Sequence, residues 1–400
     1  MNFSPTSVSE RLELAVWSAS QQEWSVVLHY LQTLSSVQIG QLLRADREQL
    51  VDMVLMALVQ GDFNQRWELT KLLPKLGGIV QTPLIQLLRD PNAETEARWF
   101  AVRILGGLPS PEVVIALTEL LSTAEEELAQ IAAETLAQIG PAAVDGLGAL
   151  LADANIRLWV VQALRVIRTS ETVPWLLPIV NDAEPQIRSL ALETLGSFRD
   201  ASLTPYFLQA LQDSAMAPRR EAVIILGRRS DLLSTVNLVE LLQPLLHDVH
   251  PEICQQAALS LGRLGTPLAA DILFQTAADP QTPPWLFASL VRALGWIGTE
   301  ASVQYLGALT ADVAEISLLE IVQMLGRQNG SQLAIPASQA LGQLLVQSRV
   351  MDSGPLKTAI ASALGQLGCV ESIPALQSLG QDPEHRVRLY AQSALNKLTR

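Results

Sequence analysis

The feature that most constrains the fold is a leucine that recurs along the chain with a period of about 31 residues. Eleven such anchors are separated by 28 to 39 residues, and every anchor is preceded by an aliphatic residue four positions earlier. The anchors are Leu73, Leu105, Leu136, Leu164, Leu195, Leu226, Leu261, Leu294, Leu325, Leu364 and Leu395. A fixed period of this length is typical of solenoids, in which each repeat is one supersecondary unit stacked on its neighbours.

Each anchor lies on an apolar stripe with the spacing of one helix face. Apolar residues recur eight and four positions before most anchors, directly before them and three positions after them, which is a helical periodicity. A glycine follows seven of the anchors, as at Gly106, Gly262 and Gly365. Glycine lets neighbouring backbones approach closely and also ends helices. We therefore interpret each anchor segment as the second helix of a helical hairpin.

The first helices are indicated by hydroxyl residues that stand before a proline and an apolar run. These pairs are Thr82-Pro83, Ser110-Pro111, Thr204-Pro205 and Thr266-Pro267. A hydroxyl is a favoured helix cap and proline is favoured at the first helical position. Two helices fit into one period, and no strand pattern competes. We predict an all-α fold, an α-solenoid superhelix of about eleven helical hairpins.

The domain organisation follows from where the anchor signature begins. Residues 1–61 lack it but contain apolar-periodic runs, so we expect them to form an N-terminal helical cap. Residues 62–400 are expected to form a single continuous repeat domain. The two longest intervals, 35 and 39 residues before Leu261 and Leu364, predict longer first helices or loops there.

Composition excludes several classes of function. The chain has 27 basic and 40 acidic residues, a net charge of -13, which argues against nucleic-acid binding because phosphate contacts need clustered Lys and Arg. There is no secretory signal pattern and no run of eighteen apolar residues, so we expect a cytoplasmic protein without membrane insertion. Cys254 and Cys369 stand outside any metal-binding or disulfide motif and are expected to be small buried residues.

Several segments carry a family resemblance. LRDPNAETEARWFAVRILGGL, VNDAEPQIRSLALETLGSF and LGQDPEHRVRLYAQSALNKL resemble HEAT repeats of the short type found in phycobilisome-lyase-like proteins, and the similarity spans about residues 62–400. The resemblance implies a non-catalytic scaffold or an assembly or turnover factor, cyanobacterial and linked to phycobiliproteins or another photosynthetic component. The family also includes bilin lyase subunits, so a bilin lyase or lyase-like subunit is the alternative.

An arginine seven positions before six of the anchors is preceded by an aspartate four to eight residues earlier. The pairs are Asp62 and Arg66, Asp90 and Arg98, Asp153 and Arg157, Asp182 and Arg188, Asp213 and Arg219, and Asp382 and Arg388. An aspartate in the turn between two helices could cap the second helix and pair with that arginine. We predict that these residues form a structural ladder along the stack and not a functional site.

The candidate site comes from two segments, RWELTKLL and RWFAVRIL, which start 32 residues apart. They place Trp67 and Trp99 six positions before an anchor, with Lys71 and Arg103 four residues further on, opposite the buried stripe. Exposed Trp and Arg dominate binding hot spots, so we predict that these four residues bind a partner protein, possibly a phycobiliprotein. Two alternatives are packing against a neighbouring repeat and binding of a tetrapyrrole.

Residues for catalysis are not recognisable in this sequence. There is no Ser/His/Asp arrangement, no phosphate-binding loop and no context for a nucleophilic cysteine. His247 and His250 are the one conceivable metal pair, but the intervening Asp248 is expected to cap a helix. We therefore predict no catalytic residues, no metal site and no cofactor, except for a bilin under the lyase alternative.

Overall fold

The described part of the chain folds into helices joined by turns and short loops. The computed structural model describes residues 8–311, 313–329 and 332–398, and this part of the chain contains 26 α-helices, nine short 3-10 helices and no β-strand. Three α-helices come first, α1 (Val8–Ser20), α2 (Trp24–Thr33) and α3 (Ser36–Gln41). Eleven helical hairpins follow, and they confirm the predicted all-α solenoid.

The second helices of the hairpins carry the leucine anchors or end beside them. They are α5 (Phe63–Leu72), α7 (Thr95–Gly106), α9 (Glu126–Ile139), α11 (Arg157–Ile167), α13 (Pro185–Leu195), α15 (Met216–Leu226), α17 (Pro251–Leu264), α19 (Pro284–Ile297), α21 (Glu315–Gly326), α24 (Gly354–Leu367) and α26 (His385–Leu398). Most of them are longer and more regular than the first helices that pair with them.

The first helices are α4 (Arg44–Gln60), α6 (Gly78–Arg89), α8 (Pro111–Thr123), α10 (Val144–Ala149), α12 (Val173–Leu176), α14 (Thr204–Ala210), α16 (Leu238–Leu242), α18 (Pro267–Ala278), α20 (Glu300–Ala308), α22 (Ala334–Leu344) and α25 (Ile373–Leu379). The 3-10 helices are Leu73–Leu76, Pro141–Ala143, Leu150–Ala152, Ser170–Thr172, Pro178–Asn181, Ala201–Leu203, Ser230–Leu232, Gln243–His247 and Val370–Ser372. Many of these flank a shortened first helix. The 39-residue interval holds an additional short helix, α23 (Ser348–Met351), where the spacing predicts a longer first helix or loop.

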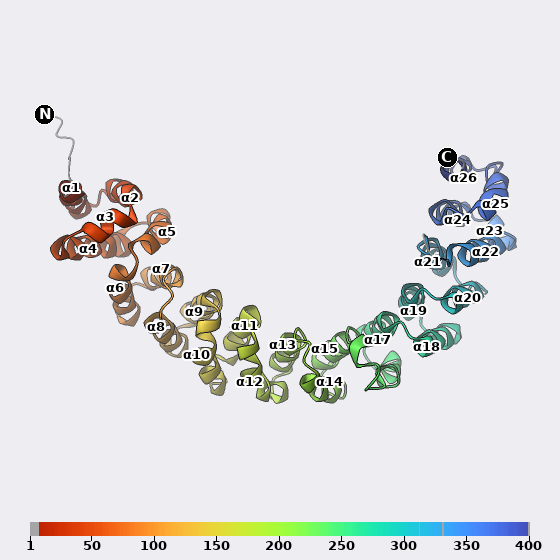
Figure 1. Cartoon of the computed structure of the whole chain (residues 1–400), viewed down its shortest axis with the longest axis horizontal. Helices are drawn as coiled ribbons and strands as arrows, with labels where there is room; N and C mark the ends of the chain where they lie inside the picture. Colours follow the sequence, from red (N-terminus) through yellow and green to blue (C-terminus); the bar gives the residue numbers. More distant parts are fainter. Residues whose placement is uncertain (1–7, 312, 330–331, 399–400) are drawn as a thin grey trace. The chain divides into compact units, whose positions relative to one another are not determined.

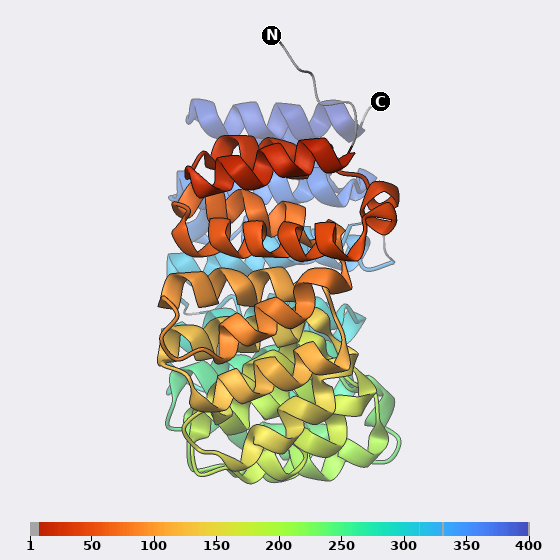
Figure 2. The same cartoon turned by 90° about the vertical axis from the view of Figure 1, so that its left-hand side faces the viewer.

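The helices form two compact units, Met1–Phe198 and Arg199–Arg400. Within each unit the hairpins stack in chain order, so the second helices make one layer and the first helices the other (Figure 1). Figure 2 shows the helices of the first unit stacked one above another. Helix α4 packs on both α1 and α5, and Gly61 separates α4 from α5. The domain boundary at residue 61 and the single continuous repeat domain stay predictions.

The core is the periodic stripe seen in the sequence. Ten of the eleven anchors are fully buried, and so are all eleven aliphatic residues four positions before them. Leu395 is half-buried because α26 is the last helix of the stack. Cys254 and Cys369 are buried as predicted, and burial raises the pKa of both thiols.

Glycines after the anchors hold successive second helices against each other. A Cβ on Gly262 of α17 would lie 2.7 Å from the Cα of Ala293 on α19, and a Cβ on Gly365 of α24 would lie 2.7 Å from the Cβ of Ala394 on α26. Gly106, Gly227, Gly295 and Gly326 approach the residue before the next anchor in the same way. At Gly227, Gly262, Gly326 and Gly365 the approach reaches the backbone of the next helix, and at Gly106 and Gly295 it reaches a side chain, at distances that a larger residue would not allow.

Two of the four predicted helix starts are confirmed. The hydroxyl of Ser110 accepts a hydrogen bond from the amide of Val113 at 3.3 Å, and the hydroxyl of Thr266 accepts one from Ala269 at 3.1 Å. Pro111 and Pro267 occupy the first helical position of α8 and α18.

The other two predicted starts, Thr82-Pro83 and Thr204-Pro205, are wrong. Helix α6 begins at Gly78, after Gly77 turns the chain with a φ of 64°, so Pro83 lies inside the helix. Helix α14 begins at Thr204 itself, because a 3-10 turn capped by Asp200 precedes it. A cap further upstream therefore overrode the hydroxyl-proline signal in both places.

The close approach of α17 and α19 predicts the effect of a single added methyl group. Gly262→Ala would place its Cβ against the backbone of Ala293, so the free energy of unfolding should fall by about 1–3 kcal/mol. Gly342 lies inside α22 with open space around it, and Gly342→Ala should raise stability by about 0.5–1 kcal/mol. Urea denaturation measures the free energy of unfolding of both variants. An equal change in the two variants would contradict the prediction.

Candidate functional site

The structure brings three of the four predicted partner-binding residues together on α5 and α7. The guanidinium carbon of Arg103 lies 5.2 Å from the ring centroid of Trp67 and 5.2 Å from that of Trp99. Both separations are within the range of cation–π attraction. Arg103 therefore links the tryptophan of its own hairpin to that of the preceding one.

Two phenylalanines complete what we call the aromatic–arginine cluster: Phe63, Trp67, Trp99, Phe100 and Arg103. Phe100 is fully buried and meets the other three rings edge to face, with centroids 5.1–6.4 Å apart. Phe63 stacks on Trp67 at 6.1 Å with an interplanar angle of 12°. Both arrangements are preferred geometries for aromatic pairs, so the exposed rings stand on a fixed base.

The cluster is open to solvent on its outer side. The side chain of Phe63 is 56% exposed and that of Trp67 is 37% exposed, while Trp99 and Arg103 are half-buried. In the described part of the chain, Arg103 has no carboxylate partner. Exposed aromatic rings around a cation that lacks a counter-ion have the composition of a binding hot spot.

Lys71 differs from the other three predicted residues. Its ammonium group forms an ion pair with the carboxylate of Glu68 at 2.6 Å, one turn earlier on α5, and both side chains are largely exposed. Such a pair contributes little to stability. Phe63, which the sequence analysis missed, stands four residues before Trp67, a spacing that places it on the same helix face.

Arg66, Arg157 and Arg219, three of the residues predicted to form a ladder, bind carboxylates of the next hairpin. Arg219 binds both carboxylate oxygens of Asp248, at 3.0 and 3.1 Å, and donates to the backbone carbonyls of Asp213 and Ser214. Asp213 turns its own carboxylate onto the amide of Ala215, two residues ahead. The arginine therefore spans two hairpins, because the carboxylate that it binds belongs to the turn of the next one.

Other members of the ladder follow related patterns. The bonds are Arg157 to the Asp182 carboxylate at 2.6 Å, Lys357 to the Asp382 carboxylate at 2.7 Å, Arg66 to Glu94 and Glu96, Arg98 to the Leu88 carbonyl, Arg188 to the Asp182 and Ala183 carbonyls, and Arg388 to the Asp382 and Pro383 carbonyls. The carboxylate of Asp90 accepts from the amide of Asn92, and that of Asp62 caps α5. Arg66, Arg157 and Lys357 therefore connect two hairpins, whereas these bonds of Arg98, Arg188 and Arg388 reach carbonyls of their own hairpin.

The His247 and His250 segment is organised around the same ladder. Asp248 accepts a hydrogen bond from the amide of His250 at 2.9 Å and also binds Arg219. Within residues 8–311, 313–329 and 332–398, no group of three or more His, Cys, Asp or Glu side chains is arranged to bind a metal ion.

Comparison with known proteins identifies the class and then the family. The stacked hairpins define an α-solenoid. HEAT repeats match residues 82–165, 144–226 and 204–285, which together cover more than half of the chain without a gap, and a PBS lyase HEAT-like repeat matches residues 356–379. The chain belongs to the HEAT-repeat family, as the sequence resemblance predicts.

A relative and two solved structures are similar to this chain. The uncharacterized phycocyanin operon protein Z of Pseudanabaena tenuis (strain PCC 7409) is 25% identical over 150 residues, which is 36% of this chain and 73% of that protein. Karyopherin Kap121p bound to the extreme C-terminus of the protein phosphatase Cdc14p has a TM-score of 0.57, 11% identity and coverage of 99% of this chain and 54% of its own. Importin beta has a TM-score of 0.55, 14% identity and coverage of 97% and 59%.

These likenesses to solved structures show the fold alone. This chain spans a little over half the length of these two proteins. No helix in the described part of the chain has the length and apolarity needed to cross a membrane.

The pair between Arg219 and Asp248 predicts a large effect of one truncation. Both side chains are about nine-tenths buried, so Asp248→Ala would leave a buried guanidinium without its carboxylate. The free energy of unfolding should fall by about 3 kcal/mol. In Glu320→Ala, the loss of the more exposed pair with Arg292 should cost at most about 1 kcal/mol, and equal losses in urea denaturation would contradict the prediction.

The same aspartate predicts how stability depends on pH. Burial alone would raise the pKa of Asp248, but hydrogen bonds from Arg219 and from the amide of His250 outweigh it and hold the pKa below its ordinary value. A carboxyl with a lowered pKa in the folded state stabilises the protein above its unfolded pKa of about 3.9, and this contribution is lost as the pH falls towards the folded pKa. Between about pH 5 and 3, Asp248→Asn should therefore lose less stability than the wild type, and parallel pH profiles would refute this.

Proposed function

We propose that this protein is a non-catalytic scaffold that binds a partner protein through the aromatic–arginine cluster. The observation that carries the proposal is Arg103, which faces two tryptophan rings and no carboxylate within the described residues. A partner that covers these rings would strengthen the interactions of the cation by excluding water. The buried ring of Phe100 holds the surface rigid, so little entropy is lost on binding.

The proposed partner is a phycobiliprotein or another photosynthetic component, met in the cytoplasm. Two similarities support this choice: the PBS lyase HEAT-like repeat at residues 356–379 and the relative from a phycocyanin operon. The role would be in the assembly or turnover of that partner.

The alternative is a bilin lyase or a lyase-like subunit, which the match at residues 356–379 favours. Under this alternative, the faces of Trp67 and Trp99 would stack on a tetrapyrrole and Arg103 would bind a propionate. A lyase would therefore bind free bilin, whereas the scaffold would bind the assembled protein.

The scaffold proposal predicts that the two tryptophans govern partner binding. Trp67→Ala with Trp99→Ala should weaken binding of purified phycocyanin at least tenfold, because hot-spot residues contribute about 2 kcal/mol or more each. Trp285 and Trp296 are also exposed, at 41% and 45%, and replacing both by alanine should leave binding unchanged. The affinity for phycocyanin is measured by surface plasmon resonance with the wild type and both double variants immobilised.

Two results would contradict the scaffold proposal. Equal phycocyanin binding by all three proteins would show that the aromatic–arginine cluster is not the binding surface. If the wild type did not bind phycocyanin, the proposed phycobiliprotein partner would be wrong. The lyase alternative is tested by adding phycocyanobilin and apo-phycocyanin. A covalent adduct with shifted visible absorbance would make the protein a lyase, and the scaffold proposal expects none.

A further inference from the structure

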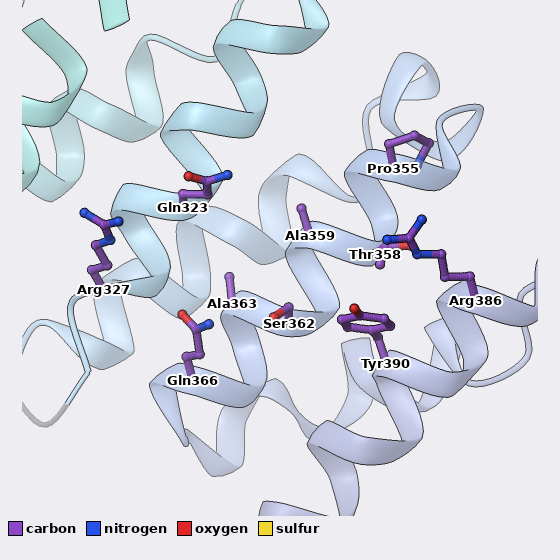
Figure 3. A pocket seen from close by; sticks show the side chains of 10 residues that line it. All are labelled: Gln323, Arg327, Pro355, Thr358, Ala359, Ser362, Ala363, Gln366, Arg386 and Tyr390. Atoms are coloured by element: carbon purple, nitrogen blue, oxygen red, sulfur yellow. The ribbon is translucent and has the colours of Figure 1, made fainter. Parts of the chain in front are cut away.

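A second surface in the unit Arg199–Arg400 has the features of a binding groove. Helices α21, α24 and α26 enclose a pocket of about 470 Å³ (Figure 3). Its lining consists of Gln323 and Arg327 from α21 and its end, Pro355, Thr358, Ala359, Ser362, Ala363 and Gln366 from α24, and Arg386 and Tyr390 from α26. The floor is one face of α24. Its lining residues run from Pro355 to Gln366, roughly 16 Å along the helix axis at about 1.5 Å per residue. The site is therefore elongated.

The groove is cationic in an acidic protein. Figure 3 shows Arg327 and Arg386 on opposite sides, with the small side chains of Ala359 and Ser362 between them. The lining contains no carboxylate, and neither arginine forms an ion pair with any residue that the structure describes. The whole chain carries a net charge of -13, so this pair of guanidinium groups opposes the overall charge. Guanidinium groups bind carboxylates with two parallel hydrogen bonds.

The remaining polar side chains suit a peptide backbone. Gln323 and Gln366 carry carboxamides, which donate and accept hydrogen bonds as a peptide group does. The small floor residues leave space for a main chain to lie close to α24. Elongation, amide groups and two separated cations together indicate an extended peptide with acidic side chains.

Thr358 adds a buried polar side chain beside the groove. The residue lines the pocket and is only 7% exposed, and its hydroxyl oxygen has no hydrogen-bond partner among the described residues. A threonine inside a helix ordinarily bonds the carbonyl three or four residues earlier. A buried hydroxyl without a partner destabilises the unbound protein, and this oxygen is itself shielded from solvent.

We propose that the groove between α21, α24 and α26 binds an acidic peptide segment in an extended conformation. Arg327 and Arg386 bind two of its carboxylates, while Gln323 and Gln366 bind its backbone. This inference does not rest on the aromatic–arginine cluster, which lies in the other unit.

The test uses the full-length protein and fluorescein-labelled hexaglutamate, with binding followed by fluorescence anisotropy. Arg327→Gln with Arg386→Gln should weaken binding at least tenfold. Arg220→Gln with Arg228→Gln changes the net charge equally at two exposed positions outside the groove and should have little effect. Equal losses in the two double variants would show general electrostatic attraction and overturn the proposal.

A second variant blocks the groove and keeps its charges. Ala359→Trp should fill the floor and also weaken hexaglutamate binding at least tenfold, with a thermal unfolding curve like that of the wild type. Unlabelled hexaglutamine and inorganic phosphate should not displace the labelled peptide at equal concentration. The proposal fails if the wild type does not bind hexaglutamate, if Ala359→Trp binds it normally, or if phosphate displaces it as a small-anion site would.

Discussion

The contact on which the structure depends is the approach of six post-anchor glycines to the residue before the next anchor. At Gly262 and Gly365 the missing Cβ lets the second helix touch the backbone or Cβ of its successor. This contact sets the spacing of the layer of second helices within a unit. The same spacing lets Arg103 reach the tryptophan of the preceding hairpin, and it places the floor of the groove beside α21, where Gly326 meets Ala363.

Helix faces could be predicted from the sequence because they follow from periodicity alone. The buried stripe and the grouping of Trp67, Trp99 and Arg103 both result from counting positions against 3.6 residues per turn. The start of α14 was not predictable in this way, since an upstream cap competed with Thr204. The register of the arginine ladder was also missed, because it depends on how far one hairpin extends over the next.

The two proposed surfaces use the same layer in different ways. Both are formed mainly by exposed or half-buried positions on the second helices, together with the buried Phe100 in the first unit and the buried Thr358 and Ala363 in the second. In the first unit these positions hold rings and one arginine, which suit a partner surface with apolar area. In the second unit they hold amides, small residues and two arginines, which suit a main chain with carboxylates.

The shared aspartates change where one repeat ends and the next begins. Asp248 shapes the turn before α17, yet its carboxylate completes the site of Arg219 on α15. A cut placed at the end of α15 would therefore separate a buried cation from its counter-ion, although it respects the hairpin boundary. A shortened or rearranged repeat array should therefore keep Asp182, Asp248 and Asp382 together with the hairpins that precede them. The module that can be transferred is then offset from the sequence period.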